Sequence, residues 1–87
     1  MLLYGFLKTQ SVTANLWFSM REAVTIGKQI RKYRRAKDIT QEQLAEKIGV
    51  SLAWIGRVER GSTFPTVQLL IRIAQVLRVK VNDLIPF

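Results

Sequence analysis

The chain has 87 residues, which suits one small domain, and its 14 Lys and Arg outnumber its 6 Asp and Glu to give a formal net charge of +8. It contains no Cys and no His, so disulfide scaffolds, zinc fingers and thiol catalysis are excluded. An acid–base or metal site would have little to be built from, and we expect neither an enzyme nor a cofactor. A balance this basic favours a polyanionic partner such as nucleic acid.

The chain divides near its beginning. Residues 1–24 contain several aromatic side chains and show no sustained helical or strand period, so they are interpreted as an irregular extension to a domain over residues 25–87. Met20 begins a stretch that looks like a natural start for such a domain. Residues 1–19 are therefore either a disordered or artefactual gene-model extension, or a real arm that docks on a partner.

No targeting segment is recognised at the start of the chain. The apolar run of residues 1–7 ends at Lys8, far short of the roughly 20 residues that a membrane span needs. No positively charged stretch precedes Leu2, as a secretory signal would require. We expect a soluble, cytoplasmic protein with no membrane partner.

Five short helices are predicted in the domain, in chain order over residues 25–37, 40–48, 52–60, 67–77 and 81–85. In the first of them, Ile26, Ile30 and Tyr33 recur at i, i+4 and i+7 and form one apolar stripe. Its other faces hold six basic residues and no acid, namely Lys28, Arg31, Lys32, Arg34, Arg35 and Lys37. This run favours general attraction to phosphates, with a solvated helix flank as the alternative.

The boundaries of the middle helices carry specific capping signals. Thr40 and Gln43 fit a capping box, in which each residue closes an open backbone donor of the other. Gly49 ends the second helix because glycine adopts the left-handed conformation at no steric cost. Ser51 and Thr66 are expected to cap the third and fourth helices.

The fourth predicted helix is apolar nearly all round. The side chains predicted to face the core are Val67, Leu70, Ala74 and Leu77, and a second stripe is formed by Leu69, Ile73 and Val76. Apolar surface beyond what the core needs implies a cover or a partner. A twofold homodimer through the fourth and fifth helices is the preferred interpretation of the second stripe, and residues 1–24 folding over it is the alternative.

Two short helices joined by a three-residue turn that contains glycine have the spacing of a helix-turn-helix. Gly49 supplies the turn, and Ala45 is small enough for the helices to cross closely. Ile55 and Val58 give the second of the two helices an apolar inner face. The outer face of this second helix is thereby left free to enter a groove of a binding partner.

The sequence resembles the phage repressor/Cro-type (Xre-type) helix-turn-helix family from about Ile26 to Ile85. The matching stretches are Thr40-Gln41-Glu42-Gln43-Leu44-Ala45, Ile48-Gly49-Val50-Ser51, Ile55-Gly56-Arg57-Val58-Glu59-Arg60-Gly61, and Pro65 followed by Leu70, Ala74 and Leu77. The resemblance implies a compact, all-α, five-helix lambda-repressor-like domain that places its third helix in the major groove of double-stranded DNA.

The family pattern also implies which residues meet DNA. The positions that would face bases are Leu52, Ala53, Gly56 and Arg57, and those that would meet the backbone are Gln41, Ser51, Trp54, Arg60, Ser62, Thr63 and Arg35. Of the base-facing set, only Arg57 can form a bidentate contact with guanine. Contact with phosphate alone is the alternative for Arg57, a capping role for Gln41, and packing on the domain itself for Trp54.

An acid on a DNA-facing helix would repel phosphate, so Glu59 needs a partner. The family pairs this position with an arginine of the first helix, which corresponds to Arg34 here.

Three other positions depart from the family pattern and are expected to lower stability. Asp38 and Arg78 replace glycines that end helices, and Lys80 replaces a Ser or Thr cap.

The function that these features predict is that of a small, sequence-specific DNA-binding transcriptional regulator, with a repressor as the preferred form and a homodimer as its preferred state. A restriction–modification controller is similar in size. An antitoxin, which would also bind a toxin partner, and a membrane-surface module anchored by its N-terminal aromatics are the other classes.

Overall fold

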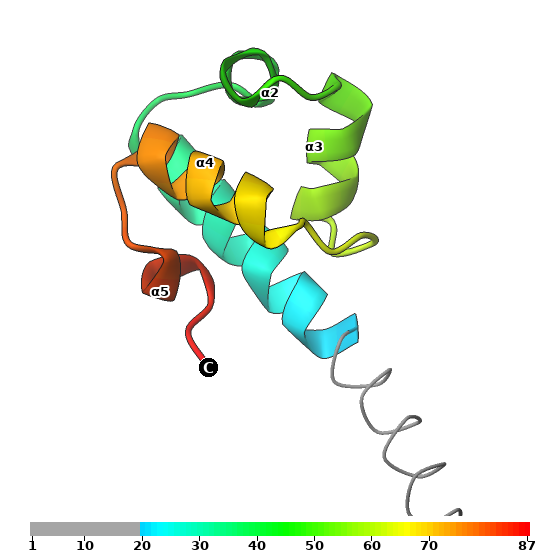
Figure 1. Ribbon diagram of the computed structural model, residues 1–87. Coiled ribbons are helices and arrows are strands. Elements are labelled where there is room, and N and C mark those ends of the chain that lie inside the picture. The colour runs from blue at the N-terminus through cyan, green and yellow to red at the C-terminus, as the bar shows by residue number, and fades with distance from the viewer. Residues whose placement is uncertain (1–19) are drawn as a thin grey trace, which may run out of the picture.

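The computed structural model describes residues 20–87, in which every regular element is a helix (Figure 1). The first helix is helical from residue 20, where the described part begins, to residue 36. It is followed by α2 (Gln41–Ile48), α3 (Leu52–Glu59), α4 (Val67–Leu77) and α5 (Val81–Leu84). The five predicted helices are thus present within residues 20–87, and the all-α prediction is confirmed.

The first helix begins earlier than predicted. Residues 20–24 are helical rather than irregular, and Ala23 is buried with 5 % of its surface exposed. Ala23 precedes Ile26 by three residues and Ile30 by seven, so it extends the same apolar stripe by one turn. The predicted boundary at residue 24 therefore falls inside this helix. Residues 1–19, including the predicted extension and the candidate translation start, lie outside the described residues.

The first four helices all end in the same way. The backbone turns left-handed at one residue, and the next residue donates its N–H to the carbonyl five positions back. The left-handed residues are Asp38, Gly49, Gly61 and Arg78, with φ between 56° and 77°. The closing bonds run from Ile39 to Arg34, Val50 to Ala45, Ser62 to Arg57 and Val79 to Ala74, at 2.9–3.1 Å. Asp38 and Arg78 keep this geometry without glycine, at a conformational cost of about 1–2 kcal/mol for an ordinary residue.

The predicted N-terminal caps are present. Thr40 Oγ1 accepts from the Gln43 N–H at 3.0 Å, while Gln43 Oε1 accepts from the Thr40 N–H at 2.9 Å. Ser51 and Thr66 accept the corresponding bonds at the starts of α3 and α4. Ahead of α5 only one of the two capping-box hydrogen bonds forms, because the Lys80 ammonium group cannot accept a hydrogen bond from the helix backbone. The Lys80 N–H donates instead to the Asp83 carboxylate at 2.9 Å.

One apolar cluster joins all five helices. Its buried members are Ile26, Ile30, Leu44, Ala45, Ile48, Ile55, Val58, Leu70, Ile73, Ala74, Leu77 and Leu84. On α4 the core stripe differs from the predicted one, since Val67 is 72 % exposed and Ile73 is fully buried. The other three predicted core residues, Leu70, Ala74 and Leu77, are buried together with Ile73, and α2 and α5 both contact α4.

The first helix passes very close to the end of α3. A Cβ added at Gly27 would lie 2.3 Å from the Val58 carbonyl oxygen and 2.7 Å from that of Glu59. Both atoms belong to the backbone, so a side chain at position 27 would force the two helices apart. Gly27 thus fixes how closely α3 is held against the first helix.

We expect Gly27→Ala to destabilise the protein by about 1–3 kcal/mol, because the added methyl group overpacks a backbone contact. Gly56→Ala is the matched control in another helix. Its Cβ would meet only the flexible end of the Arg60 side chain, so the higher helix propensity of alanine should stabilise the protein by about 0.5–1 kcal/mol. Urea unfolding measures both. Equal effects of the two substitutions would contradict the close approach at Gly27.

Candidate nucleic-acid interface

The α2–turn–α3 unit packs one side of α3 against the hydrophobic core and leaves the other side exposed to solvent. The turn from Gly49 to Ser51 lets α3 cross α2, and α3 directs Ile55 and Val58 into the core, where they are 0 % and 1 % exposed. Leu52, at the start of α3, is 51 % exposed. In Figure 1, α3 stands at the edge of the molecule, beside α2 and away from α5.

The structure separates the four predicted base-contacting residues into two groups. Leu52, Ala53 and Arg57 are exposed. Gly56 is buried, which corrects its prediction as a base-contacting residue. The guanidinium of Arg60 covers it, since a Cβ added at Gly56 would lie 3.0 Å from Arg60 Nη1. Because Gly56 has no side chain, the side chain of Arg60, about one turn further along the chain, can lie over it.

The predicted backbone-contacting residues differ in their exposure. Ser51 and Ser62 are exposed, at the two ends of α3, and Ser62 Oγ donates to the Arg57 carbonyl at 3.1 Å. Trp54 is half-buried and packs on the core, as its alternative interpretation held. Thr63 is half-buried and Arg60 is exposed. Arg35 also is exposed, on the first helix and one residue past the buried Arg34.

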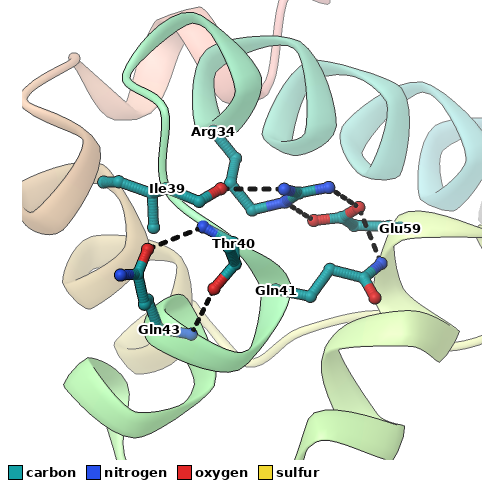
Figure 2. Close-up of polar contacts among 6 residues, drawn as sticks. All are labelled: Arg34, Ile39, Thr40, Gln41, Gln43 and Glu59. Carbon is teal, nitrogen blue, oxygen red and sulfur yellow. Dashed lines mark hydrogen bonds and ion pairs between the residues drawn. The ribbon is translucent and has the colours of Figure 1, made fainter.

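A buried ion pair joins the first helix to α3 (Figure 2). Arg34 Nε lies 2.6 Å from Glu59 Oε2, and Arg34 Nη2 lies 3.0 Å from Glu59 Oε1, so the contact is bidentate. The Arg34 side chain is 9 % exposed and the Glu59 side chain 2 %. Arg34 Nη1 also donates to the Ile39 carbonyl at 2.8 Å. The two residues that the family pattern pairs are thus in direct contact.

Gln41 takes part in the same network. Its Nε2 donates to Glu59 Oε1 at 3.0 Å, so Glu59 accepts from both the first helix and α2. This contact was not predicted, because nothing in the local sequence places a residue at the start of α2 beside the end of α3. Gln41 remains only half-buried, and it holds the N-terminus of α2 beside the last turn of α3.

The pairing of Glu59 leaves the outer side of α3 positive. Arg57 and Arg60 are exposed, and within residues 20–87 neither makes a side-chain hydrogen bond or an ion pair. α3 carries one acidic residue, and Arg34 neutralises it. The exposed side of α3 therefore offers free guanidinium donors with no opposing charge.

The predicted dimer face on α4 is wrong in part. Ile73 is fully buried, and Val76 packs on the core. Leu69 is half-buried. The exposed apolar residues lie on the other flank of the helix and in the preceding loop, namely Phe64, Val67 and Ile71, with 45 %, 72 % and 42 % of their surface exposed. Since residues 67 and 71 are one turn apart, they share one face of α4.

Comparison with known proteins identifies the family. A family model described as Helix-turn-helix (HTH_3) matches residues 30–84. The chain belongs to this family. It is 35 % identical over 65 residues to YazB of Bacillus subtilis, an uncharacterized HTH-type transcriptional regulator, covering 75 % of this chain and 94 % of YazB. No helix in the described part of this helix-turn-helix protein is long and apolar enough to cross a membrane.

Other relatives of this helix-turn-helix protein are longer. The chain is 38 % identical over 61 residues to the regulator SinR of Bacillus subtilis and 34 % identical over 59 residues to the phage repressor RstR from Vibrio cholerae. These matches cover 69 % and 68 % of this chain but only 55 % of SinR and 53 % of RstR. The chain thus spans about half the length of these two proteins.

Solved structures share the fold. The restriction–modification controller protein C.AhdI from Aeromonas hydrophila matches with a TM-score of 0.70 and 30 % identity, over 74 % of this chain and 97 % of that one. The clp gene regulator ClgR from Corynebacterium glutamicum matches with a TM-score of 0.68 and 32 % identity, over 75 % of this chain and 67 % of that one. The likeness therefore covers nearly the whole of C.AhdI.

Removing one partner of the buried pair should be costly. We expect Arg34→Ala to destabilise the protein by about 3–5 kcal/mol, because it leaves the Glu59 carboxylate buried without its counter-charge. The double variant Arg34→Leu/Glu59→Leu should recover most of this loss, since neither charge is then stranded. Arg35→Ala, one residue away but exposed, should change stability by less than about 0.5 kcal/mol. Urea unfolding of the series checks this, and a double variant no more stable than Arg34→Ala would exclude the coupling.

Proposed function

We propose that the chain is a sequence-specific double-stranded DNA-binding transcriptional regulator that acts as a repressor. The observation that supports the proposal is that α3 is buried on one side and exposed on the other. Its Ile55 and Val58 side is held in the core, while Leu52, Ala53 and Arg57 stand free. A helix presented in this way fits the major groove of B-DNA. The similarity to RstR, a transcriptional repressor, supports repression as the form of regulation.

Within the groove, Arg57 is the residue that reads a base. A guanidinium fork matches the O6 and N7 acceptors of guanine, and Arg57 has no competing partner in the described part of the chain. Leu52 and Ala53 offer apolar contact to thymine methyl groups but no hydrogen bond to a base edge. Specificity then depends on arginine contacts and on the shape of the DNA.

The duplex is held by phosphate contacts around α3. Gln41 lies at the start of α2, where free backbone donors and the helix dipole favour an anion. Ser51, Ser62 and Thr63 lie beside the two ends of α3, and Trp54 contributes its exposed edge. With a formal net charge of +8, binding should weaken steeply as salt rises.

A restriction–modification controller is the second candidate function. It is favoured by the match to C.AhdI, which extends over 97 % of that protein and leaves no part of it for a further domain. The two functions share the DNA-reading geometry and differ in the genes that they control.

We propose that the protein binds DNA as a homodimer through Phe64, Val67 and Ile71. These side chains are exposed and apolar, and Val67 and Ile71 form one stripe on α4. A twofold dimer would cover them and would place two copies of α3 on half-sites about 34 Å apart. This flank replaces the predicted face of Leu69, Ile73 and Val76.

The dimer has a direct test. Ile71→Glu should shift the protein from dimer to monomer in analytical ultracentrifugation at micromolar concentration, because it places a charge in the proposed interface. Arg72→Glu, at the next position of α4 and also exposed, is the control and should remain dimeric. A variant Ile71→Glu that stays as dimeric as the parent would argue for another interface.

Base reading is tested by binding-site selection from random duplexes. Arg57→Ala should flatten the preference for guanine at one base pair of each half-site, lowering affinity for the selected site by roughly 5- to 150-fold, the equivalent of about 1–3 kcal/mol. Arg72→Ala removes the same charge from α4 and should keep the full preference. The proposed function fails if the wild-type protein selects no sequence and shows no binding to duplex DNA at low salt.

A further inference from the structure

The side chain of Arg60 lies over the part of α3 where Gly56 has no side chain. It follows the last residue of α3, and side chains on a helix lean toward the N-terminus. Its guanidinium accordingly reaches back one turn, where Nη1, Cζ and Nη2 would lie 3.0, 3.8 and 3.9 Å from a Cβ at Gly56. The nearness of all three atoms to that position means that the guanidinium lies beside Gly56 rather than extending from the end of the helix.

This placement depends on the small residues of α3. A Cβ at Gly56 would be tighter than an ordinary van der Waals contact with Nη1, so a side chain there would make the guanidinium shift by a few tenths of an ångström. Ala53 stands on the same exposed side, seven residues before Arg60, and projects only a methyl group. Gly56 and Ala53 therefore add little bulk beside the Arg60 guanidinium on this side of α3.

Arg57 and Arg60 share one face of the helix at i and i+3. The two positions are about 4.5 Å apart along the helix axis, which is close to the roughly 3.4 Å rise between adjacent base pairs. Both guanidinium groups are exposed, and neither has a side-chain partner within residues 20–87. Each therefore brings an unused pair of parallel donors to the groove.

We propose that Arg60 is a second specificity-determining residue, which reads a guanine at a base pair next to the one read by Arg57. The family pattern assigns Arg60 to the DNA backbone, and its position at the end of α3 alone would agree. The position of the guanidinium over Gly56 favours base reading, because it lies one turn back from the end of the helix. This inference rests on the proposed function, since it requires α3 to enter the major groove.

Lysine substitutions separate base reading from phosphate contact. Arg60→Lys keeps the positive charge but loses the planar fork that guanine requires. Binding-site selection is run in parallel on the wild type, Arg57→Lys, Arg60→Lys and Arg72→Lys, each checked by thermal unfolding. The substitution at Arg72, an exposed residue of α4, controls for the exchange of side-chain type.

We expect Arg60→Lys to lose a guanine preference of roughly 5- to 150-fold at one base pair, adjacent to the base pair at which Arg57→Lys loses its own. Non-specific binding to a random duplex should stay within about twofold of the wild type, because the charge is retained. An unchanged preference in Arg60→Lys, with Arg57→Lys impaired, overturns the role of Arg60 and leaves the proposed function intact. A wild-type protein without any preference overturns the proposed function itself.

The variant Gly56→Ala provides an independent test that alters no charge. The methyl group makes the guanidinium shift by a few tenths of an ångström, so this variant should weaken the same guanine preference that Arg60→Lys loses, while remaining at least as stable as the wild type. The preference that depends on Arg57 should persist. If Gly56→Ala selects the same sites as the wild type, the Arg60 guanidinium does not read a base from this position, and the inference is wrong.

Discussion

The buried contact between Arg34 and Glu59 fixes the part of the molecule on which everything else depends. It joins the first helix to the last residue of α3, and Gln41 brings the start of α2 to the same carboxylate. Two charges taken out of water need excellent geometry to offset their desolvation, and the bidentate contact supplies it. The network therefore specifies the relative position of three helices more than it adds to net stability.

The same contact governs the charge of the exposed side of α3. An unpaired carboxylate at the end of a DNA-reading helix would oppose the phosphates, but Glu59 is turned inward and neutralised. What remains outside is positive, because Arg57 and Arg60 face solvent. One buried pair thus makes α3 both firmly held and electrostatically suited to a polyanion.

Glycine acts on this arrangement in two different ways. Gly27 allows the first helix to approach the backbone of α3, so its missing side chain sets the distance between helices. Gly56 lies on the other side of α3, where its missing side chain leaves a space that the Arg60 guanidinium occupies. The first glycine serves the packing of the domain, and the second shapes the surface that would meet DNA.

The sequence by itself determined the helices, their caps and the helix-turn-helix unit, because capping boxes, turn glycines and apolar stripes are local signals. The resemblance to the family supplied the pairing of Arg34 with Glu59. Only the tertiary structure decided that Ile73 rather than Val67 joins Leu70, Ala74 and Leu77 in the core, since a helix that is apolar on most sides has no sharp boundary to its buried face until other helices pack against it. The cover of Arg60 over Gly56 and the bond from Gln41 to Glu59 were likewise beyond the sequence, because both depend on where side chains lie once the helices are in place.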